Sequence, residues 1–203
     1  MAGLKNIAIF ASGYGSNFSA IASAIKRRKI RANLALLVCD NPKAPVLKKA
    51  KKAKVKAALV LKDEFLSRED FEAKIIGHLK ENNIDLIVLA GFMRILGPDL
   101  ILRYKNKILN IHPALLPAFK GSHAIKDAFN YGAKVTGVTV HFVDEKMDHG
   151  PIILQQAVLI GEKDTADSLE TKIHKVEHRL YPEAIKLFVE GKLKIEERRV
   201  NRL

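Results

Sequence analysis

Asn110 and His112 stand two residues apart in the stretch from 107 to 120, and both side chains can handle charge. Apolar residues alternate with them, so on a strand the carboxamide and the imidazole leave from the same face. Pro113 cannot donate to a sheet ladder, which ends the expected strand where these side chains lie. A carboxamide beside an imidazole can stabilise an oxyanion while a proton moves. A buried pair satisfied by backbone groups gives the same pattern, so both interpretations stay open.

A glycine turn at residues 12–17 is the second stretch that could bind a ligand. It follows an apolar run over 4–11, which is typical of a strand buried in a parallel sheet. We expect Ser16 or Asn17 to cap the helix that follows. A strand, a glycine turn and a helix N-terminus together form an anion site from backbone N–H groups. Because Phe18 replaces the third glycine of a dinucleotide fingerprint, a single phosphate monoester fits better, and a turn without a ligand is the alternative.

Three further segments carry candidate residues, each with a structural alternative. Apolar residues in the expected loop 91–97 suggest a flat hydrophobic ligand, with hinge packing as the alternative. Asp148 lies in a loop bounded by glycine and proline, where an isolated aspartate is better interpreted as a turn former. A helix expected from about 165 to 181 carries three titratable residues on one face, Glu170, His174 and Glu177. They are close enough in register to meet one ligand or simply water.

The elements that must position these residues alternate between strand and helix patterns. Besides the strand at Asn110, strands are expected over residues 4–11, 33–39, 57–61 and 84–90. Short apolar strands separated by helices are typical of an α/β protein with a parallel sheet. Ser67 with Asp70 forms a capping-box-like helix start, and His123 begins another helix. The alternation over 135–144, followed by an apolar run at 152–160, predicts an antiparallel extension of the sheet.

The C-terminal part is expected to contain a break. Pro182 favours the start of a separate last helix, and Gly191 is expected to end it. The segment 192–203 is highly charged, and we expect it to be frayed or bound to the surface.

Composition excludes several classes of protein. The 203 residues suffice for one well-buried domain, and 48% apolar with 28% charged residues is ordinary for a globular enzyme. No apolar run approaches the roughly 20 residues that span a bilayer, and the N-terminus enters a strand pattern directly, so we expect a cytoplasmic protein without membrane contact. Cys39 is the single cysteine, and no His-Glu-x-x-His or Cys/His cluster occurs, so we expect no metal. Covalent catalysis is not indicated, because Gly-x-Ser-x-Gly is absent.

The formal net charge of +13 is the unusual bulk property. It fits a nucleic-acid partner, an anionic small substrate or a basic proteome, and charge alone does not choose among them. The densest basic block, residues 48–56, has no aromatic residue among its lysines to stack on bases. This weakens the interpretation as a single-strand binder.

Five motifs occur in order, Gly13-Tyr-Gly-Ser-Asn17, Leu89-Ala-Gly-Phe-Met-Arg-Ile-Leu96, Asn110-Ile-His-Pro-Ala-Leu-Leu-Pro117, Gly137-Val-Thr-Val-His-Phe-Val143 and Met147-Asp-His-Gly-Pro-Ile-Ile153. Together they resemble the 10-formyltetrahydrofolate-dependent formyltransferases, in their glycinamide ribonucleotide branch, over almost the whole chain. Asn-x-His with a distant Asp indicates formyl transfer, whereas the glycine turn and the lack of an appended domain indicate the branch. The resemblance implies a single Rossmann-like formyltransferase domain over 1–203, with a phosphate-binding half (1–100) and a catalytic and folate-binding half (101–203).

The resemblance also implies roles for individual residues. The catalytic trio would be Asn110, His112 and Asp148. The ribonucleotide would be held by Gly15, Ser16, Asn17, His174 and Glu177, the last of which meets the glycinamide amine. The folate would be held by Arg68, Met93, Arg94, Ile95, Leu96 and Asp144. The chain departs from the family at Tyr14, where Asn is common, and at His149, where Gly is frequent. We expect the first to leave backbone phosphate binding intact and the second to alter loop flexibility.

The implied reaction is a direct transfer without an acyl-enzyme. An amine attacks the formyl carbon of 10-formyltetrahydrofolate, a co-substrate, while Asn110 and a protonated His112 hold the oxyanion and Asp148 relays a proton through water. Small molecules are then the expected partners of a monomer or homodimer, and no nucleic acid is expected. The alternatives are a 10-formyltetrahydrofolate hydrolase, another folate-dependent formyltransferase or, from a different class, a basic RNA-binding protein.

Overall fold

The computed structural model describes residues 3–203, which form two compact units. The first unit ends at Leu109, and the second runs from Asn110 to Leu203. Strand β5 (Ile108–His112) crosses from one unit into the next. This boundary lies later than residue 100, where the sequence suggested a division, and the functional role of each half stays a prediction.

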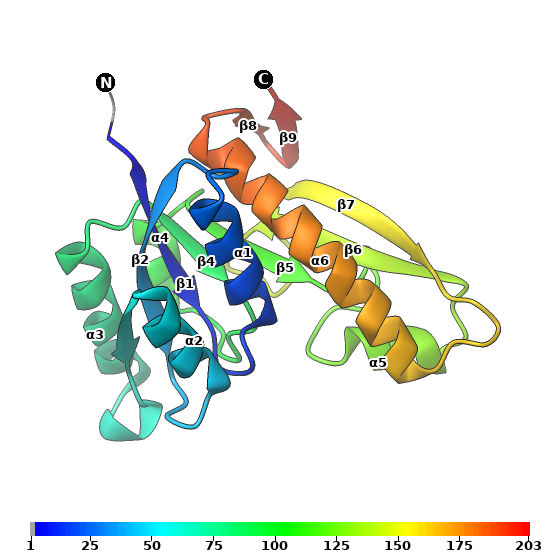
Figure 1. Ribbon diagram of the computed structural model, residues 1–203, viewed down its shortest axis with the longest axis horizontal. Helices are drawn as coiled ribbons and strands as arrows, with labels where there is room; N and C mark the ends of the chain where they lie inside the picture. Colours follow the sequence, from blue (N-terminus) through cyan, green and yellow to red (C-terminus); the bar gives the residue numbers. More distant parts are fainter. Residues whose placement is uncertain (1–2) are drawn as a thin grey trace. The chain divides into compact units, whose positions relative to one another are not determined.

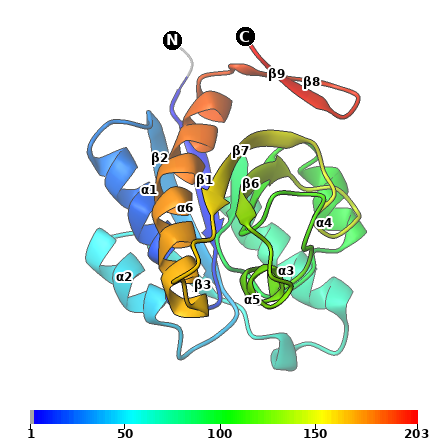
Figure 2. The ribbon, with the colours of Figure 1, turned by 90° about the vertical axis from the view of Figure 1, so that its right-hand side faces the viewer.

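The first unit is a parallel sheet flanked by helices. Its strands lie in the order β3-β2-β1-β4, with β1 (Lys5–Phe10), β2 (Ala32–Cys39), β3 (Lys56–Leu59) and β4 (Leu86–Leu89). Figure 2 shows α1 (Ser16–Lys26) and α2 (Pro45–Ala53) on one side of these strands, and α3 (Arg68–Glu81) and α4 (Pro98–Arg103) on the other. A short 3-10 helix, η1 (Lys62–Glu64), precedes α3.

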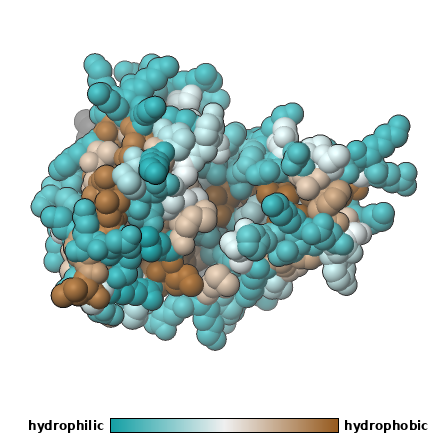
Figure 3. Space-filling model, turned by 90° about the horizontal axis from the view of Figure 1, so that it is seen from below, coloured by the Kyte–Doolittle hydropathy of each residue, from teal (hydrophilic) through white to brown (hydrophobic). Residues whose placement is uncertain are grey.

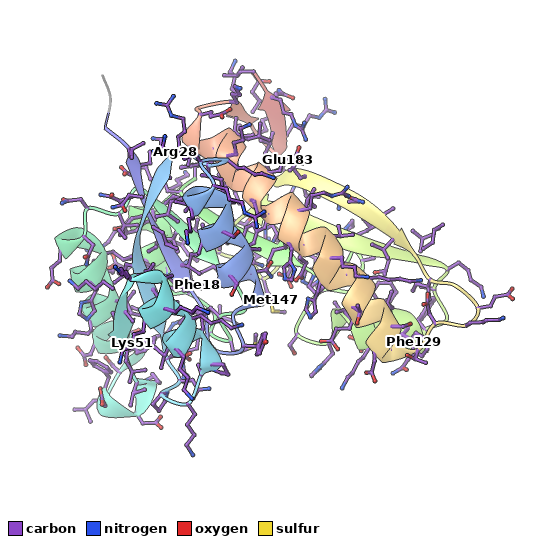
Figure 4. All side chains as sticks on the ribbon, viewed as in Figure 1. Phe18, Arg28, Lys51, Phe129, Met147 and Glu183 are labelled. Carbon is purple, nitrogen blue, oxygen red and sulfur yellow. The ribbon has the colours of Figure 1, made fainter. Side chains whose placement is uncertain are left out.

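The strands of this unit read as apolar runs because both faces are covered. All four residues of β4 and the last four of β1 are buried, as parallel strands between helix layers require. Phe18 of α1, labelled in Figure 4, is 1% exposed. An apolar stripe of α3, made of Phe71, Ile75, Ile76 and Leu79, is buried. The Ser67 side chain caps this helix, as expected, by accepting from Asp70 N at 3.0 Å. These local expectations are confirmed.

The second unit is mainly antiparallel. The strand order is β5-β6-β7-β9-β8, with β6 (Val135–Phe142), β7 (Ile152–Leu159), β8 (Leu193–Glu196) and β9 (Arg199–Arg202). The β6 and β7 strands pair antiparallel, as the alternation predicted, and α6 (Ala166–Val189) packs along both (Figure 1). Helix α5 (Ala124–Asn130) follows His123 and also contacts α6. The α/β class with a mostly parallel sheet and an antiparallel C-terminal extension is therefore confirmed.

The expected helix break at Pro182 is wrong. Pro182 lies inside α6, which continues to Val189. Proline removes one backbone hydrogen bond, but the apolar stripe runs through the site, because Tyr181, Ala184 and Ile185 are all fully buried. Burial of this continuous stripe outweighs the local cost, since helices in proteins are stabilised mostly by packing.

The C-terminal segment is also more ordered than its charge suggested. Residues 193–202 form the β8–β9 hairpin, and β9 pairs with the edge of β7 in parallel, with Arg199 opposite Ile152. Alternation of Leu193 and Ile195 with charged residues is the sequence signal that favours a strand here. Helix α4, which begins at Pro98, was not anticipated either.

Most of the face drawn in Figure 3 is hydrophilic. Figure 3 shows one face, on which hydrophilic side chains surround smaller apolar patches. Within residues 3–203, none of the helices is both long enough and apolar enough to span a bilayer.

Candidate active site

The C-terminal end of β5 brings Asn110 and His112 into one cluster, as their spacing predicted. His112 is 3% exposed, and Asn110 is half-buried. The β5 strand ends directly before Pro113, which cannot continue the ladder. A buried polar pair requires partners, and the partners here are side chains and loop carbonyls of the second unit.

Asp148 faces both residues. Its Oδ2 lies 3.4 Å from His112 Nδ1, and its Oδ1 lies 3.4 Å from Asn110 Nδ2. Gly121 N donates to Oδ2 at 2.9 Å, which fixes the carboxylate. Asp148 has a φ of 47°, a left-handed backbone that non-glycine residues rarely adopt and that concentrates at functional sites. The structure thus brings the three predicted catalytic residues together, so Asp148 is more than a turn former.

The two ring nitrogens of His112 both face acceptors. Its Nε2 donates to the Phe119 carbonyl at 2.7 Å, and its Nδ1 faces the Asp148 carboxylate. Both ring nitrogens of His112 therefore lie opposite oxygen atoms of the second unit. Phe119 itself has a φ of 48°, which turns its carbonyl toward the imidazole.

His141 is a member of this cluster that the sequence analysis did not assign. Its Nδ1 donates to the Phe142 carbonyl at 2.7 Å, which leaves Nε2 to accept from Asn110 Nδ2 at 3.2 Å. Burial lowers the pKa of His141, so it stays neutral and suited to accept this bond. His141 therefore fixes which way the Asn110 amide points. The sequence feature that could have identified His141 is a histidine near the end of an apolar strand.

The glycine turn of the first unit is built from backbone. Gly15 is the N-cap of α1 with a φ of 74°, and no side chain caps the helix, so the expected cap by Ser16 or Asn17 is wrong. A Cβ on Gly15 would overlap the Val46 side chain, which explains why only glycine fits. The first-turn N–H groups of a helix have no intrahelical acceptor. Such a helix N-terminus, together with the helix dipole, favours an anion beside Ser16 and Asn17.

Neighbouring segments hold this turn in place. Val46 N donates to the Gly13 carbonyl at 3.2 Å, and Asn41 Nδ2 donates to the Ser12 carbonyl at 3.1 Å. Tyr14, the departure from the family pattern, is 70% exposed, and Lys49 Nζ lies 3.3 Å from the centre of its ring. The tyrosine side chain is therefore exposed, with a cation beside its ring, and its effect on phosphate binding stays a prediction.

The loop 91–97 is anchored by a buried carboxylate. Glu72 Oε1 accepts from Gly97 N at 2.5 Å and from Arg68 Nε at 3.1 Å, and Arg68 Nη2 donates to the Ile95 carbonyl at 2.7 Å. A Cβ on Gly97 would overlap that carboxylate. These bonds leave Met93 and Ile95 with side chains 73% and 67% exposed, while Leu96 is buried.

The predicted folate arginines already have protein partners. Arg94 Nε donates to Asp40 Oδ2 at 2.6 Å, and its guanidinium lies 5.7 Å from the centre of the Phe71 ring. Arg68 bonds within the loop as described. Both arginines belong to the first unit, where they border the exposed side chains of the 91–97 loop.

His174 and Glu177 lie together on α6, as their spacing predicted. His174 Nδ1 donates to Glu177 Oε2 at 2.9 Å, and His174 Nε2 lies 3.4 Å from Glu170 Oε1. The bond to Glu177 raises the pKa of His174, because it stabilises the charged imidazole. Glu177 itself is 4% exposed.

Asp144 lies in the loop before β7, and its carboxylate bonds two other residues of the same loop. Its Oδ2 accepts from His149 Nδ1 at 2.7 Å, and its Oδ1 accepts from Lys146 N at 3.0 Å. No group of three or more Asp, Glu, His or Cys side chains in residues 3–203 is arranged to hold a metal ion.

Comparisons with known proteins show which family this chain resembles. The profile of a family described as formyl transferase matches residues 5–185. The phosphoribosylglycinamide formyltransferase of Bacillus subtilis is 47% identical over 183 residues, which are 90% of this chain and 94% of that protein. The enzyme of that name from Escherichia coli is 36% identical over 192 residues, 95% of this chain and 91% of that one.

A solved structure agrees in fold as well as sequence. Glycinamide ribonucleotide transformylase 1 from Symbiobacterium toebii superposes with a TM-score of 0.97 at 42% identity, covering 100% of this chain and 96% of that one. The resemblance inferred from the five motifs is confirmed. The chain therefore belongs to the formyl transferase family, among the phosphoribosylglycinamide formyltransferases.

Proposed function

We propose that the protein transfers the formyl group of 10-formyltetrahydrofolate to the amine of 5-phosphoribosylglycinamide, a step of purine biosynthesis. The observation that carries this proposal is the convergence of Asn110, His112 and Asp148 in one cluster. Relatives named for this activity, which match over most of their length, support it.

The chemistry needs stabilisation of a developing negative charge. The amine attacks the formyl carbon, and the carbonyl oxygen becomes an oxyanion that accepts hydrogen bonds from Asn110 and a protonated His112. The bond from the formyl carbon to N10 then breaks. One amine proton passes through Asp148 and water to N10, so the products are the formylated amide and tetrahydrofolate.

This mechanism requires two bonds of the cluster to be exchanged, because the two N–H groups of Asn110 face His141 and Asp148 and one of them must turn to the oxyanion. The other exchange is at His112. His112 Nε2 donates to the Phe119 carbonyl, and Nδ1 faces Asp148. For His112 to bind the oxyanion while Asp148 keeps its contact, the Phe119 carbonyl must give way to the substrate. The exchange replaces a carbonyl acceptor by a charged oxygen, and hydrogen bonds to charged groups are the stronger kind.

The substrates are assigned to the sites described above. The ribonucleotide phosphate binds the backbone of Gly15, Ser16 and Asn17, since a helix N-terminus favours a phosphate. His174 and Glu177 bind the glycinamide end, where a carboxylate suits an amine.

The folate is assigned to groups that offer apolar contact and charge. In the first unit, the loop of Met93, Ile95 and Leu96 offers apolar contact to its ring, since the first two side chains are exposed. In the second unit, the loop that begins at Asp144 is a separate candidate for folate contact. Arg68 and Arg94 bind its carboxylates through guanidinium N–H groups other than those that bond Glu72, the Ile95 carbonyl and Asp40.

One assay separates transfer from hydrolysis. Purified protein is given 10-formyltetrahydrofolate with and without 5-phosphoribosylglycinamide, and tetrahydrofolate and the formylated amide are quantified. We expect both products in equal amounts, and only when the ribonucleotide is present. Equal release of tetrahydrofolate without the ribonucleotide would establish a hydrolase instead.

A further inference from the structure

The loop that carries Asp148 is contacted by a residue outside the part of the chain that the family profile matches. That match ends at residue 185, and the β8–β9 hairpin follows it. Arg198, in the turn of this hairpin, donates from Nη2 to the His149 carbonyl at 2.7 Å. Its Nη1 lies 3.3 and 3.2 Å from the two ring nitrogens of His149. The hairpin thus touches the peptide directly after Asp148.

The β8–β9 hairpin that carries Arg198 has contacts with both β7 and α6. Arg199 of β9 pairs with Ile152, the first residue of β7. Arg202 Nη2 lies 3.6 Å from Glu183 Oε1, and Figure 4 shows the labelled Glu183 on α6 near the hairpin. Arg198 therefore projects from backbone that is held by both a strand and a helix.

His149 is held from its other side as well. Its Nδ1 donates to Asp144 Oδ2 at 2.7 Å, so the imidazole lies between a carboxylate and a guanidinium. This histidine stands where the family often has glycine. A glycine would supply the carbonyl but no ring, so His149 adds a side-chain contact to both neighbours.

The two ends of the loop that carries Asp148 lie close together, which restricts the conformations that its backbone can adopt. Phe142 N donates to the Pro151 carbonyl at 2.9 Å, which closes the loop onto β6. A Cβ on Gly150 would overlap the Phe142 carbonyl. Between these fixed points Asp148 adopts a left-handed φ of 47°, which sets the direction in which its side chain leaves the backbone. The Arg198 contact on the carbonyl of the next residue is a further constraint on this backbone.

We propose that Arg198 is a positioning residue for Asp148. Through the carbonyl and ring of His149 it holds the Asp148 loop, residues 143–151, so that the Asp148 carboxylate stays opposite His112 and Asn110. Residues Leu116, Lys120 and Ile152 line a pocket with Arg198 and Asp148, so the guanidinium and the carboxylate border the same space. This proposal rests on the proposed function, because it assigns Asp148 a part in the transfer.

The test compares three variants of the full chain. Arg198→Ala removes the contact, Arg198→Lys keeps the charge, and Arg199→Ala removes the same charge from the adjacent exposed residue of the hairpin. Formyl transfer is measured to separate kcat from KM, and hydrogen–deuterium exchange is followed in the Asp148 loop against β6 and β7. Misplacement of a catalytic group by about 1 Å can cost up to about 100-fold in rate.

We expect Arg198→Ala to lower kcat by about 10- to 100-fold while the KM for the ribonucleotide stays within about twofold. Exchange should rise in the Asp148 loop alone, and Arg198→Lys should recover part of kcat by donating to the His149 carbonyl. Arg199→Ala should behave as the unaltered protein.

A wild-type kcat in Arg198→Ala would overturn the proposal, and so would an equal loss in Arg199→Ala. Faster exchange spread equally through β6 and β7 would also overturn it, because it would show a general structural role. If the unaltered protein forms no formylated ribonucleotide, the proposed function fails, and loop exchange in Arg198→Ala alone then decides whether Arg198 holds the loop.

Discussion

The proposed catalytic cluster and the proposed phosphate-binding glycine turn are built on opposite principles. At the cluster, Asn110, His112, His141 and Asp148 are joined by side-chain contacts, so each depends on the chemical identity of the others. At the turn, Gly15 caps α1 with its backbone and no side chain takes part in the cap. Substitutions at the cluster should therefore lower the rate of the reaction. At the turn, only a change in backbone shape should strongly weaken phosphate binding.

The largest effect is expected at the donors of the cluster. Asn110→Ala and His112→Ala should each lower kcat by about 10²–10³-fold, the scale of losing one oxyanion donor, with little change in substrate dissociation constants. Steady-state kinetics and equilibrium binding measure the two quantities separately. His123→Ala, at an exposed histidine of the same unit, is the control. Equal losses of binding and rate would mean that these residues hold the ground state instead.

The next effect tests the backbone of the turn. Gly15→Ala should destabilise the fold by about 1–2 kcal/mol from the left-handed φ alone, and more from overlap with Val46. It should also weaken ribonucleotide binding, because the first N–H groups of α1 would shift. Gly13→Ala is a matched control, since a Cβ there meets no atom within 4 Å. Urea unfolding and binding assays report both changes, and equal behaviour of the two variants would refute the backbone account.

A smaller effect concerns the pH dependence of His174. Its pKa is raised above the ordinary 6.5 by the hydrogen bond to Glu177, so its contribution to stability is full below pH 6.5 and is lost as pH rises through the raised value. Glu177→Gln should move the NMR titration of His174 downward and flatten stability over that range. Glu170→Gln should move it less, since that contact is longer, at 3.4 Å. A larger shift in Glu170→Gln would reverse the assignment.

The smallest effect is expected from Ser16→Ala. If backbone N–H groups bind the phosphate, loss of the hydroxyl removes at most one hydrogen bond, about 1 kcal/mol or roughly fivefold in the dissociation constant. Folate affinity should not change. Calorimetric titration with each substrate measures both values, and a loss confined to folate would place the phosphate elsewhere.

Features set by neighbouring residues were the ones that the sequence predicted. The Ser67 cap was predicted from a spacing of three residues, and the shared face of Asn110 and His112 was predicted from the alternation of a strand. Asp148 was assigned only through the family resemblance, because its partners lie far away along the chain. The role of His141 was missed for the same reason, since it meets Asn110 across 31 positions.

The wrong expectations share a cause, which is that packing overrode a local rule. Proline is common in the first turn of a helix, yet α6 continues through Pro182 because the neighbouring residues of the helix are buried. Asn17 is a good capping residue, yet it is buried, and Gly15 takes the cap position. The charged C-terminal segment is bound at the surface, one of its two expected states, and it forms strands because the edge of β7 offers it a partner.

The most direct test of the central claim is the rate of Asp148→Asn in a single turnover with both substrates bound. Asparagine tolerates the left-handed backbone at this position, so the substitution removes charge while keeping shape. If the cluster performs the transfer, the rate should fall by about 10²–10³-fold while both dissociation constants stay near those of the unaltered protein. A rate close to that of the unaltered protein, in a folded variant that binds both substrates, would contradict the account.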